Sequence, residues 1–305
     1  ELKDQIASVI VGQEQTVDLV LTAILANGHV LIEGVPGVAK TLLARLTARL
    51  IDADFSRIQF TPDLMPSDVL GTTVFNMKTN EFDFHQGPIF ADIVLVDEIN
   101  RAPAKTQAAL FEVMEERQIS IDGITHKMGE LYTILATQNP VEQEGTYKLP
   151  EAQLDRFLMK ITMDYPSLEE EVNILERHHT NASLIKLDDI KPAITKEELL
   201  SLRALMNQVF VDRTLLQYIA LIVQQTRTSK AVYLGASPRA SVAMLQSSKA
   251  YALLQGRDFV TPEDIKFVAP YVLQHRLILT AEAEMEGYSP VKVTQRLIDK
   301  VEVPK

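Results

Sequence analysis

The stretch Val30–Leu46, VLIEGVPGVAKTLLARL, places two glycines, a lysine and a threonine in close succession. An apolar run ends at Gly34 and helical spacing of apolar residues follows Thr41, so the glycines fall between a strand and a helix. A loop of this kind can aim backbone N–H groups at phosphate oxygens, and the helix N-terminus behind it adds a favourable dipole. Lys40 would then reach the β- and γ-phosphates of a nucleotide, and the Thr41 hydroxyl would bind Mg²⁺.

One position of this loop departs from the general phosphate-loop pattern, which has glycine where this chain has Ala39. The loop tolerates the extra methyl group if the φ angle of Ala39 is negative, as suits the start of a helix. Gly37 would supply the positive φ that exposes the amides. On this stretch alone, a glycine-rich turn without a ligand is the alternative. The residues expected to surround the nucleotide are Gly34, Val35, Pro36, Gly37, Val38, Ala39, Lys40, Thr41 and Leu42.

About sixty residues further on, Asp97 and Glu98 end the apolar run IVLVDE. Ligands of open parallel sheets bind beyond the carboxyl ends of the strands. If this strand lies next to the strand that precedes the loop, Asp97 can hold the Mg²⁺ that Thr41 also binds. Glu98 can then polarise the attacking water as general base. The alternative is that two acidic residues merely end a strand in solvent.

Three further polar residues are candidates for a nucleotide site. Asn139, in ATQNP, follows a third apolar run and could orient the water, although Asn-Pro is also a common turn. Arg156 and Arg239 could stabilise the charge that phosphoryl transfer builds on the γ-phosphate. Arg239 follows Ser237 and Pro238, which mark a helix start, and a cation there opposes the helix dipole. For each arginine, an ordinary surface position is the alternative.

The elements that must position these residues follow an alternating order. Apolar runs over 29–34, 91–99 and 131–140 alternate with helical patterns, which favours a parallel sheet covered by helices. After about Asp164 the pattern becomes helical, and we expect no further strands. The predicted fold class is therefore α/β, a parallel sheet sandwiched by helices. We expect an α/β nucleotide-binding domain over 1–165 and a smaller all-helical domain over 166–305.

Two stretches inside the α/β domain have the character of inserted hairpins. Thr73–Pro88 alternates around Lys78–Asn80, and Gln118–Met128 alternates around Asp122-Gly123, a strong two-residue turn signal. Each precedes an apolar strand of the predicted sheet. We therefore expect both hairpins to be additions to the α/β domain.

The composition narrows the class of protein. The chain carries a formal charge of −11, and its basic residues are scattered, which argues against a nucleic-acid binder. No apolar run reaches the roughly 20 residues of a membrane span. The absence of cysteine excludes disulfides and thiolate metal sites. We expect a cytoplasmic protein with no membrane span.

With these residues assembled, the sequence resembles the AAA+ ATPases and, within them, the MoxR family. The resemblance covers nearly the whole chain, and its two long blocks, Val94–Ile119 and Ala136–Phe157, are highly specific. The stretches that carry it are Ile10–Gln15, Gly34–Thr41, Val94–Ile119, Ala136–Phe157 and Gly235–Ala240.

This resemblance implies roles for the candidate residues. Lys40 and Thr41 belong to Walker A, which in this family also commonly has alanine before the lysine. Asp97 and Glu98 belong to Walker B. The resemblance further implies sensor 1 at Asn139, an arginine finger at Arg156 that acts on a neighbouring subunit's ATP, sensor 2 at Arg239, and an adenine-flanking segment at Val11, Gly12 and Gln13. The two hairpins resemble the helix-2 and pre-sensor-1 insertions of this clade.

The resemblance also implies an ATPase that uses ATP and Mg²⁺ and forms a ring, usually a hexamer. Such proteins act as chaperone-like remodellers, often with von Willebrand factor A-domain partners. Three alternatives remain on the same residues. They are a motor subunit of metal-chelatase type, a nucleic-acid motor on the same fold, and a nucleotide-binding scaffold without turnover.

Overall fold

The computed structural model describes residues 2–139, 147, 149–179 and 189–303, which group into two compact units interleaved along the chain. The first unit comprises Glu1–Val17, Leu31–Leu149 and Thr162–Leu200, and the second comprises Asp18–Val30, Pro150–Ile161 and Ser201–Lys305. The domain boundary near residue 165 stays a prediction. In the described parts of the chain, no helix is long and apolar enough to cross a membrane.

A five-stranded sheet has the order β2-β5-β8-β1-β9. Parallel pairing joins β5 to β2 and to β8. The strands are β1 (Val30–Gly34), β2 (Phe55–Gln59), β5 (Ile93–Asp97), β8 (Thr133–Gln138) and β9 (Met159–Met163). The sequence predicted β1, β5 and β8, whereas β2 and β9 were not recognised.

Continuous apolar runs explain why the predicted strands lie at the centre of the sheet. Every residue of β5 is buried, and β8 is buried from Thr133 to Thr137. Helix α3 buries Leu43, Leu46 and Leu50 and packs against β2 and β5. The sheet therefore has the helical cover that its two-sided apolar strands require.

Short helices complete the first unit. They are α1 (Leu2–Val9), α3 (Lys40–Leu50), α4 (Pro66–Leu70), the 3₁₀ helix η1 (Ile99–Arg101), α5 (Ala104–Glu116) and α7 (Leu168–His179). Helices α2 (Glu14–Leu25) and α8 (Lys196–Met206) contain residues of both units.

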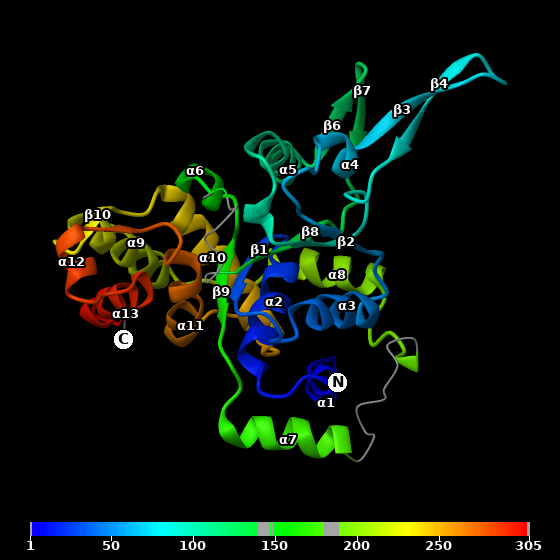
Figure 1. Ribbon diagram of the computed structural model, residues 1–305. Helices are drawn as coiled ribbons and strands as arrows, with labels where there is room; N and C mark the ends of the chain where they lie inside the picture. The colour runs from blue at the N-terminus through cyan, green and yellow to red at the C-terminus, as the bar shows by residue number, and fades with distance from the viewer. Residues whose placement is uncertain (1, 140–146, 148, 180–188, 304–305) are drawn as a thin grey trace. The chain divides into compact units, whose positions relative to one another are not determined.

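Both predicted hairpins are confirmed. They are β3 (Gly71–Asn76) with β4 (Glu81–Gln86), and β6 (Gln118–Ile121) with β7 (Ile124–Lys127). The turn between β6 and β7 is Asp122-Gly123, and both residues have positive φ, as the sequence signal predicts. Figure 1 shows the hairpins extending together from the first unit, and the Phe84 and His126 ring centroids lie 4.3 Å apart.

The second unit is mainly helical. Helix α10 packs against α9 and α11, and α11 packs against α13. The expectation that strands end after Asp164 was wrong, because two short strands form an antiparallel pair beside the small core of Leu279, Ala283, Val293 and Leu297. The elements are α6 (Glu151–Leu154), α9 (Arg213–Thr228), β10 (Val232–Leu234), α10 (Pro238–Leu254), α11 (Pro262–Leu273), β11 (Ile278–Leu279), α12 (Ala281–Met285) and α13 (Pro290–Lys300).

Candidate functional site

The predicted phosphate loop joins β1, which ends at Gly34, to α3, which begins at Lys40. A Cβ atom on Gly34 would lie 2.7 Å from Met163 O, so the close approach of β9 demands glycine there. Gly37 has a φ of 91°, and no described atom lies within 4 Å of an added Cβ. Its requirement for glycine is therefore conformational, as predicted.

Ala39 does not have the negative φ that we expected. Its φ is 62° and its ψ is 23°, in the left-handed region, and it is the N-cap of α3. An N-cap residue lies outside the helical dihedrals, so the start of the helix did not fix its φ. For a residue with a Cβ, this conformation costs about 1–2 kcal/mol. The loop therefore holds strain at the position where the general pattern has glycine.

The lysine of the loop folds back across it. Lys40 Nζ donates a hydrogen bond to Gly34 O over 2.5 Å, which joins the two ends of the loop. Thr41 follows in the first turn of α3 and is partly buried. The two side chains predicted to bind phosphate and Mg²⁺ thus lie together at the N-terminus of this helix.

Asp97 ends β5 as a buried carboxylate with two partners. Its Oδ1 accepts a hydrogen bond from Thr137 Oγ1 at 3.0 Å, and its Oδ2 lies 2.6 Å from Arg57 Nε. Thr137 comes from the neighbouring strand β8, and Arg57 comes from β2 on the other side. The carboxylate is therefore fixed from both neighbouring strands.

Glu98 follows at once and has a φ of 56°. Its backbone N–H donates to Thr137 Oγ1 at 3.0 Å, so this threonine fixes both acidic residues. On the side chain, Oε2 accepts from Gln59 Nε2 at 2.8 Å and lies 3.1 Å from Arg101 Nε. The Glu98 side chain remains 30% exposed, so water can reach it.

The prediction for Asp97 assumed that its strand lies next to the strand that precedes the phosphate loop, and this assumption is wrong. Strand β5 does not lie next to β1, because β8 lies between them in the sheet. The same order puts Asn139, which directly follows β8, at the end of the intervening strand. Asn139 is buried. Residues 140–146 of the resemblance block that contains Asn139 lie outside the described residues.

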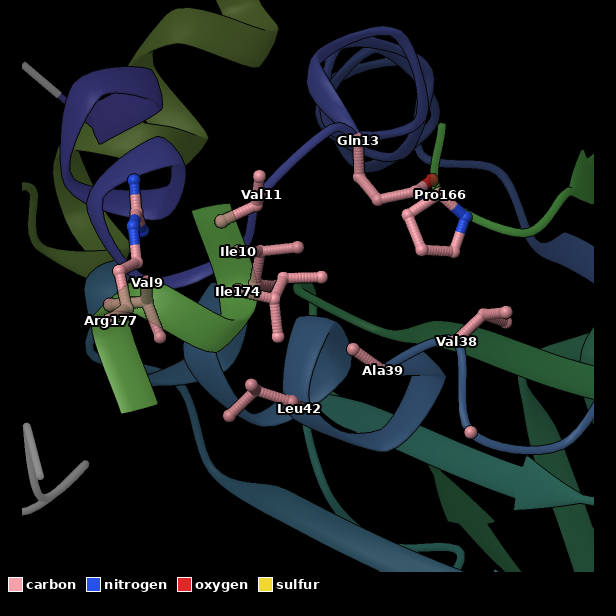
Figure 2. Close-up of a pocket in the computed structure, with 11 residues that line it drawn as sticks. Val9, Ile10, Val11, Gln13, Val38, Ala39, Leu42, Pro166, Ile174 and Arg177 are labelled. Atoms are coloured by element: carbon pink, nitrogen blue, oxygen red, sulfur yellow. The ribbon is translucent and has the colours of Figure 1, made fainter. Parts of the chain in front are cut away.

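A pocket of about 240 Å³ adjoins the phosphate loop (Figure 2). The loop contributes Gly37, Val38 and Ala39, and Leu42 of α3 continues this wall. The remaining walls come from the end of α1 and the segment after it, from the residue Pro166 before α7, and from the middle and last turn of α7. These remaining lining residues are Val9, Ile10, Val11, Gln13, Pro166, Ile174 and Arg177.

The pocket has the character of a site for a flat heterocycle. Its lining is mainly apolar, with Gln13 and Arg177 as polar side chains, which suits a base that stacks and makes a few directed hydrogen bonds. The structure brings Val11 and Gln13 to the pocket. Pro166, Ile174 and Arg177 were missed, because nothing in their local sequence indicates a contact with a loop more than a hundred residues away.

Gly12 is not part of the pocket lining, but it fixes the segment that is. Its φ is 72°, and a Cβ atom there would lie 2.3 to 2.9 Å from the Glu170 carboxyl group. Glu170 itself is held by the start of α7, where its Oε2 accepts from Ser167 N at 2.6 Å. This hydrogen bond lowers the pKa of the Glu170 carboxyl. The start of α7 therefore packs directly on the Val11–Gln13 segment.

Arg156 and Arg239 belong to the second unit, whereas the other predicted site residues belong to the first. Arg156 lies between α6 and β9. Arg239 is in the first turn of α10 behind Ser237, the N-cap residue, as predicted. In the described structure, the Ser237 side chain accepts no hydrogen bond from the amides of that turn. The roles of both arginines toward a nucleotide stay predictions.

The candidate metal ligands at the site fit Mg²⁺. The Thr41 hydroxyl and the Asp97 carboxylate are hard oxygen ligands, which this ion prefers. Among the described residues, no group of three or more His, Asp or Glu side chains could hold a metal ion. Mg²⁺ typically binds through one or two carboxylates together with substrate phosphates and water, so Thr41 and Asp97 fit this ion.

Comparisons with known proteins agree with this geometry. Residues 29–159 match the model of the ATPase family associated with various cellular activities (AAA), and residues 224–299 match the AAA lid domain. A crystal structure of a candidate ATPase from Cytophaga hutchinsonii is similar, with a TM-score of 0.91 and 41% identity. It matches over 100% of this chain and 94% of its own.

Two curated relatives extend the likeness. YeaC of Bacillus subtilis, an uncharacterized protein, is 47% identical over 99% of this chain and 93% of its own length. Chaperone MoxR1 of Mycobacterium tuberculosis is 44% identical over 99% of this chain and 81% of its own length. The fold and the family matches define an AAA domain followed by an AAA lid. Within that class, the chain belongs to the MoxR family of AAA+ ATPases.

Proposed function

We propose that this protein binds ATP with Mg²⁺ in the first unit and hydrolyses it to ADP and phosphate. One observation carries the proposal. Thr137 fixes Asp97 and Glu98 together at a strand end, in the same unit as a phosphate loop that adjoins a base-sized pocket. A scaffold without turnover has no need for a partly exposed carboxylate such as Glu98 at this place.

Binding would rearrange the two ends of the loop. Lys40 Nζ leaves Gly34 O and moves to the β- and γ-phosphate oxygens, while the loop amides donate to the same groups. Thr41 and Asp97 would hold Mg²⁺, whose positive charge would offset the negative charge of the phosphates. Arg57, whose side chain is half-exposed, would then leave Asp97 and move into solvent.

Hydrolysis would rest on Glu98. A water oriented by Asn139 would attack the γ-phosphorus and give a proton to the Glu98 carboxylate. The bond between the γ-phosphorus and the bridging oxygen would break, so that ADP leaves. Gln59 and Arg101 both contact Oε2 of Glu98, so they compete with the attacking water for this oxygen. Full activity therefore requires that Glu98 be released from at least one of them.

The decisive experiment replaces the base without changing its shape. Glu98→Gln should keep ATP affinity within about twofold of wild type. We expect its turnover to fall by about a hundredfold or more, because general acid–base catalysis contributes that much. Glu112→Gln, an exposed carboxylate on α5, is the matched control. Unchanged turnover in Glu98→Gln would remove Glu98 as the base.

We propose further that the protein works as a ring, a hexamer by family resemblance, in which Arg156 acts on the ATP of a neighbouring subunit and Arg239 on its own. Arg156→Ala should then lose turnover and regain it when mixed with Lys40→Ala subunits, because the two defects lie on different sides of a shared site. Failure to regain turnover at every mixing ratio would count against action across an interface.

A protein partner, rather than a nucleic acid, is the client that we propose, with the protein acting in the cytoplasm. The hairpin β3–β4 exposes Met77 by 90% and Phe82 by 72%. Large apolar side chains that are this exposed to solvent suit contact with another protein. The same hairpin sets Lys78 against Glu81 and Asp83, which gives no basic stripe for a phosphate backbone. The family resemblance suggests a von Willebrand factor A-domain protein as the candidate.

The protein partner can be identified with a variant that binds ATP but does not hydrolyse it. Glu98→Gln protein held with ATP should retain a partner in a pull-down, and Met77→Ser with Phe82→Ser added should release it while nucleotide binding persists. Lys78→Ala, in the same hairpin, is the control. Retention of the partner by the doubly substituted hairpin would place the contact elsewhere.

A further inference from the structure

In the second unit, one buried arginine holds the chain on both sides of Arg156. Arg276, in the turn after α11, has a side chain that is 4% exposed. Its Nε donates to Asp155 Oδ1 at 2.6 Å, and its Nη2 donates to Phe157 O at 2.7 Å and to Asp155 O at 3.2 Å. The backbone immediately before and after Arg156 is therefore bound to one guanidinium group.

The residues before Arg276 extend this attachment. Gln274 Nε2 donates to Lys160 O at 2.5 Å, and His275 Nε2 lies 3.0 Å from Phe157 O. Burial, and then the charge of Arg276, hold the pKa of His275 well below its usual value. The ring is therefore neutral and uses its Nε2–H as a donor to the carbonyl. Three consecutive side chains thus bind the segment that carries Arg156.

The same carboxylate also reaches the helix that carries Arg239. Asp155 Oδ2 accepts from Ser237 Oγ at 3.4 Å, a long hydrogen bond. Ser237 is the N-cap of α10, and its hydroxyl is directed to Asp155 instead of to the first-turn amides. Burial lowers the pKa of Arg276, its bond to Asp155 raises it, and the nearby positive charge of Arg239 lowers it further. Arg239 follows Ser237 by two residues in the first turn of α10, so the helix start that Asp155 contacts is the one that carries Arg239.

Arg276 holds this segment through the geometry of its hydrogen bonds as well as through its charge. A buried guanidinium is costly unless its N–H groups find acceptors, and here carbonyls and a carboxylate accept them at fixed angles. A lysine carries the same charge but cannot make the planar set of bonds. The hydrogen bonds of Arg276 thus fix the position of the Arg156 backbone. Asp155, which accepts a hydrogen bond from Ser237, connects this backbone to the start of α10.

We propose that Asp155, Ser237 and Arg276 form a clamp that joins the two phosphate-directed arginines into one positioned element. The clamp residues are positioning residues: when Arg239 engages the γ-phosphate of its own subunit, Asp155 moves Arg156 as well. The nucleotide state of one subunit thereby sets how Arg156 is presented to the next. This inference rests on the proposed function, because both arginines must act on ATP.

Asp155→Asn tests the clamp most directly. It keeps the shape of the side chain but removes the charge that holds Arg276. We expect kcat to fall about tenfold or more, because a small misplacement of a catalytic group has effects of this size, while KM stays within about threefold. Ser237→Ala removes only the link to α10, and a several-fold fall in kcat is expected. Ser289→Ala, which removes a true N-cap from α13, is the matched control.

A second measurement separates positioning from general damage. Lys40→Ala subunits supply an intact Arg156 but no active site of their own. Mixing them with Asp155→Asn or Ser237→Ala subunits should raise turnover per active site, because each repaired site then borrows an intact neighbouring arginine. A defect confined to the subunit's own fold would give no such rise.

The outcomes are distinguishable. If wild-type protein lacks ATPase activity, the proposed function fails first. If wild type is active and folded Asp155→Asn has wild-type kcat, or mixing gives no rise, the clamp is wrong. Should Asp155→Asn not fold, Ser237→Ala decides, and a kcat equal to that of Ser289→Ala overturns the inference.

Discussion

Arg57 forms an ion pair with Asp97, the residue whose carboxylate is expected to bind Mg²⁺. Arg57 Nε lies 2.6 Å from Asp97 Oδ2. The two residues lie on the parallel strands β2 and β5, two positions apart in register, so the Arg57 side chain reaches along the pair to Asp97. Arg57 is 50% exposed, whereas Asp97 is 9% exposed. The arginine therefore neutralises a buried carboxylate but can swing into solvent when a cation arrives.

Arg57→Ala should lower the Mg²⁺ concentration needed for half-maximal ATPase activity. An ion pair with one half-exposed partner is worth at most about 1 kcal/mol, so the shift should not exceed about fivefold. A Mg²⁺ titration at saturating ATP measures it. Arg45→Ala, an exposed arginine on α3, serves as control. An increased Mg²⁺ requirement would show instead that Arg57 orients Asp97 for the ion.

Gly12→Ala should damage the base pocket. Its Cβ would meet the Glu170 carboxyl at 2.3 Å, and Glu170 could move only by giving up its hydrogen bond to Ser167. We expect ATP to bind several-fold more weakly with kcat much less affected, because Glu170 and the Val11–Gln13 segment beside it must shift to make room.

Gly256→Ala is the matched control for this prediction. Gly256 has a φ of 74°, close to the 72° of Gly12, but no described atom lies within 4 Å of an added Cβ. It therefore has similar backbone strain and no collision. Equal ATP affinity in Gly12→Ala and wild type, measured by titration calorimetry, would mean that α7 does not fix the pocket.

Ala39→Gly should stabilise the protein. Glycine adopts the φ of 62° without the steric cost that alanine has, about 1 kcal/mol, and the melting temperature should rise by about 2 °C. Ala108→Gly, in the exposed interior of α5, should destabilise by a similar amount, because glycine disfavours a helix. A lower melting temperature in Ala39→Gly would show that the strain at Ala39 is compensated within the loop.

Local patterns were sufficient for the parts of the site that lie at element ends. Glycines between an apolar run and a helical pattern marked the loop, and Asp97 and Glu98 followed an apolar run that could only be a buried strand. The hairpin β6–β7 was predictable because Asp122-Gly123 adopts the positive φ angles that a tight turn needs.

Tertiary contacts set the limit of these predictions. Strand β2 was missed because Arg57 and Gln59 alternate with the buried Ile58, which gives a short, half-polar run. Those same polar residues hold Asp97 and Glu98, so the partners of the carboxylates stayed hidden with the strand. The predicted φ of Ala39 was wrong because alanine favours helical dihedrals locally, whereas the turn into α3 requires a left-handed conformation.

Gln59→Ala should raise the basal ATPase rate. Gln59 Nε2 donates to Glu98 Oε2 at 2.8 Å, and losing this bond leaves the oxygen freer to accept a hydrogen bond from water. One hydrogen bond to a charged group is worth about 1.5–3 kcal/mol, which sets an upper limit on the effect, and a rise of about threefold is reasonable because Arg101 remains on the same oxygen. Steady-state turnover at saturating ATP measures the change, with Gln118→Ala on β6 as control. A fall in turnover with unchanged KM would show that Gln59 holds Glu98 in its reactive position, and Arg101→Ala should then give a fall as well.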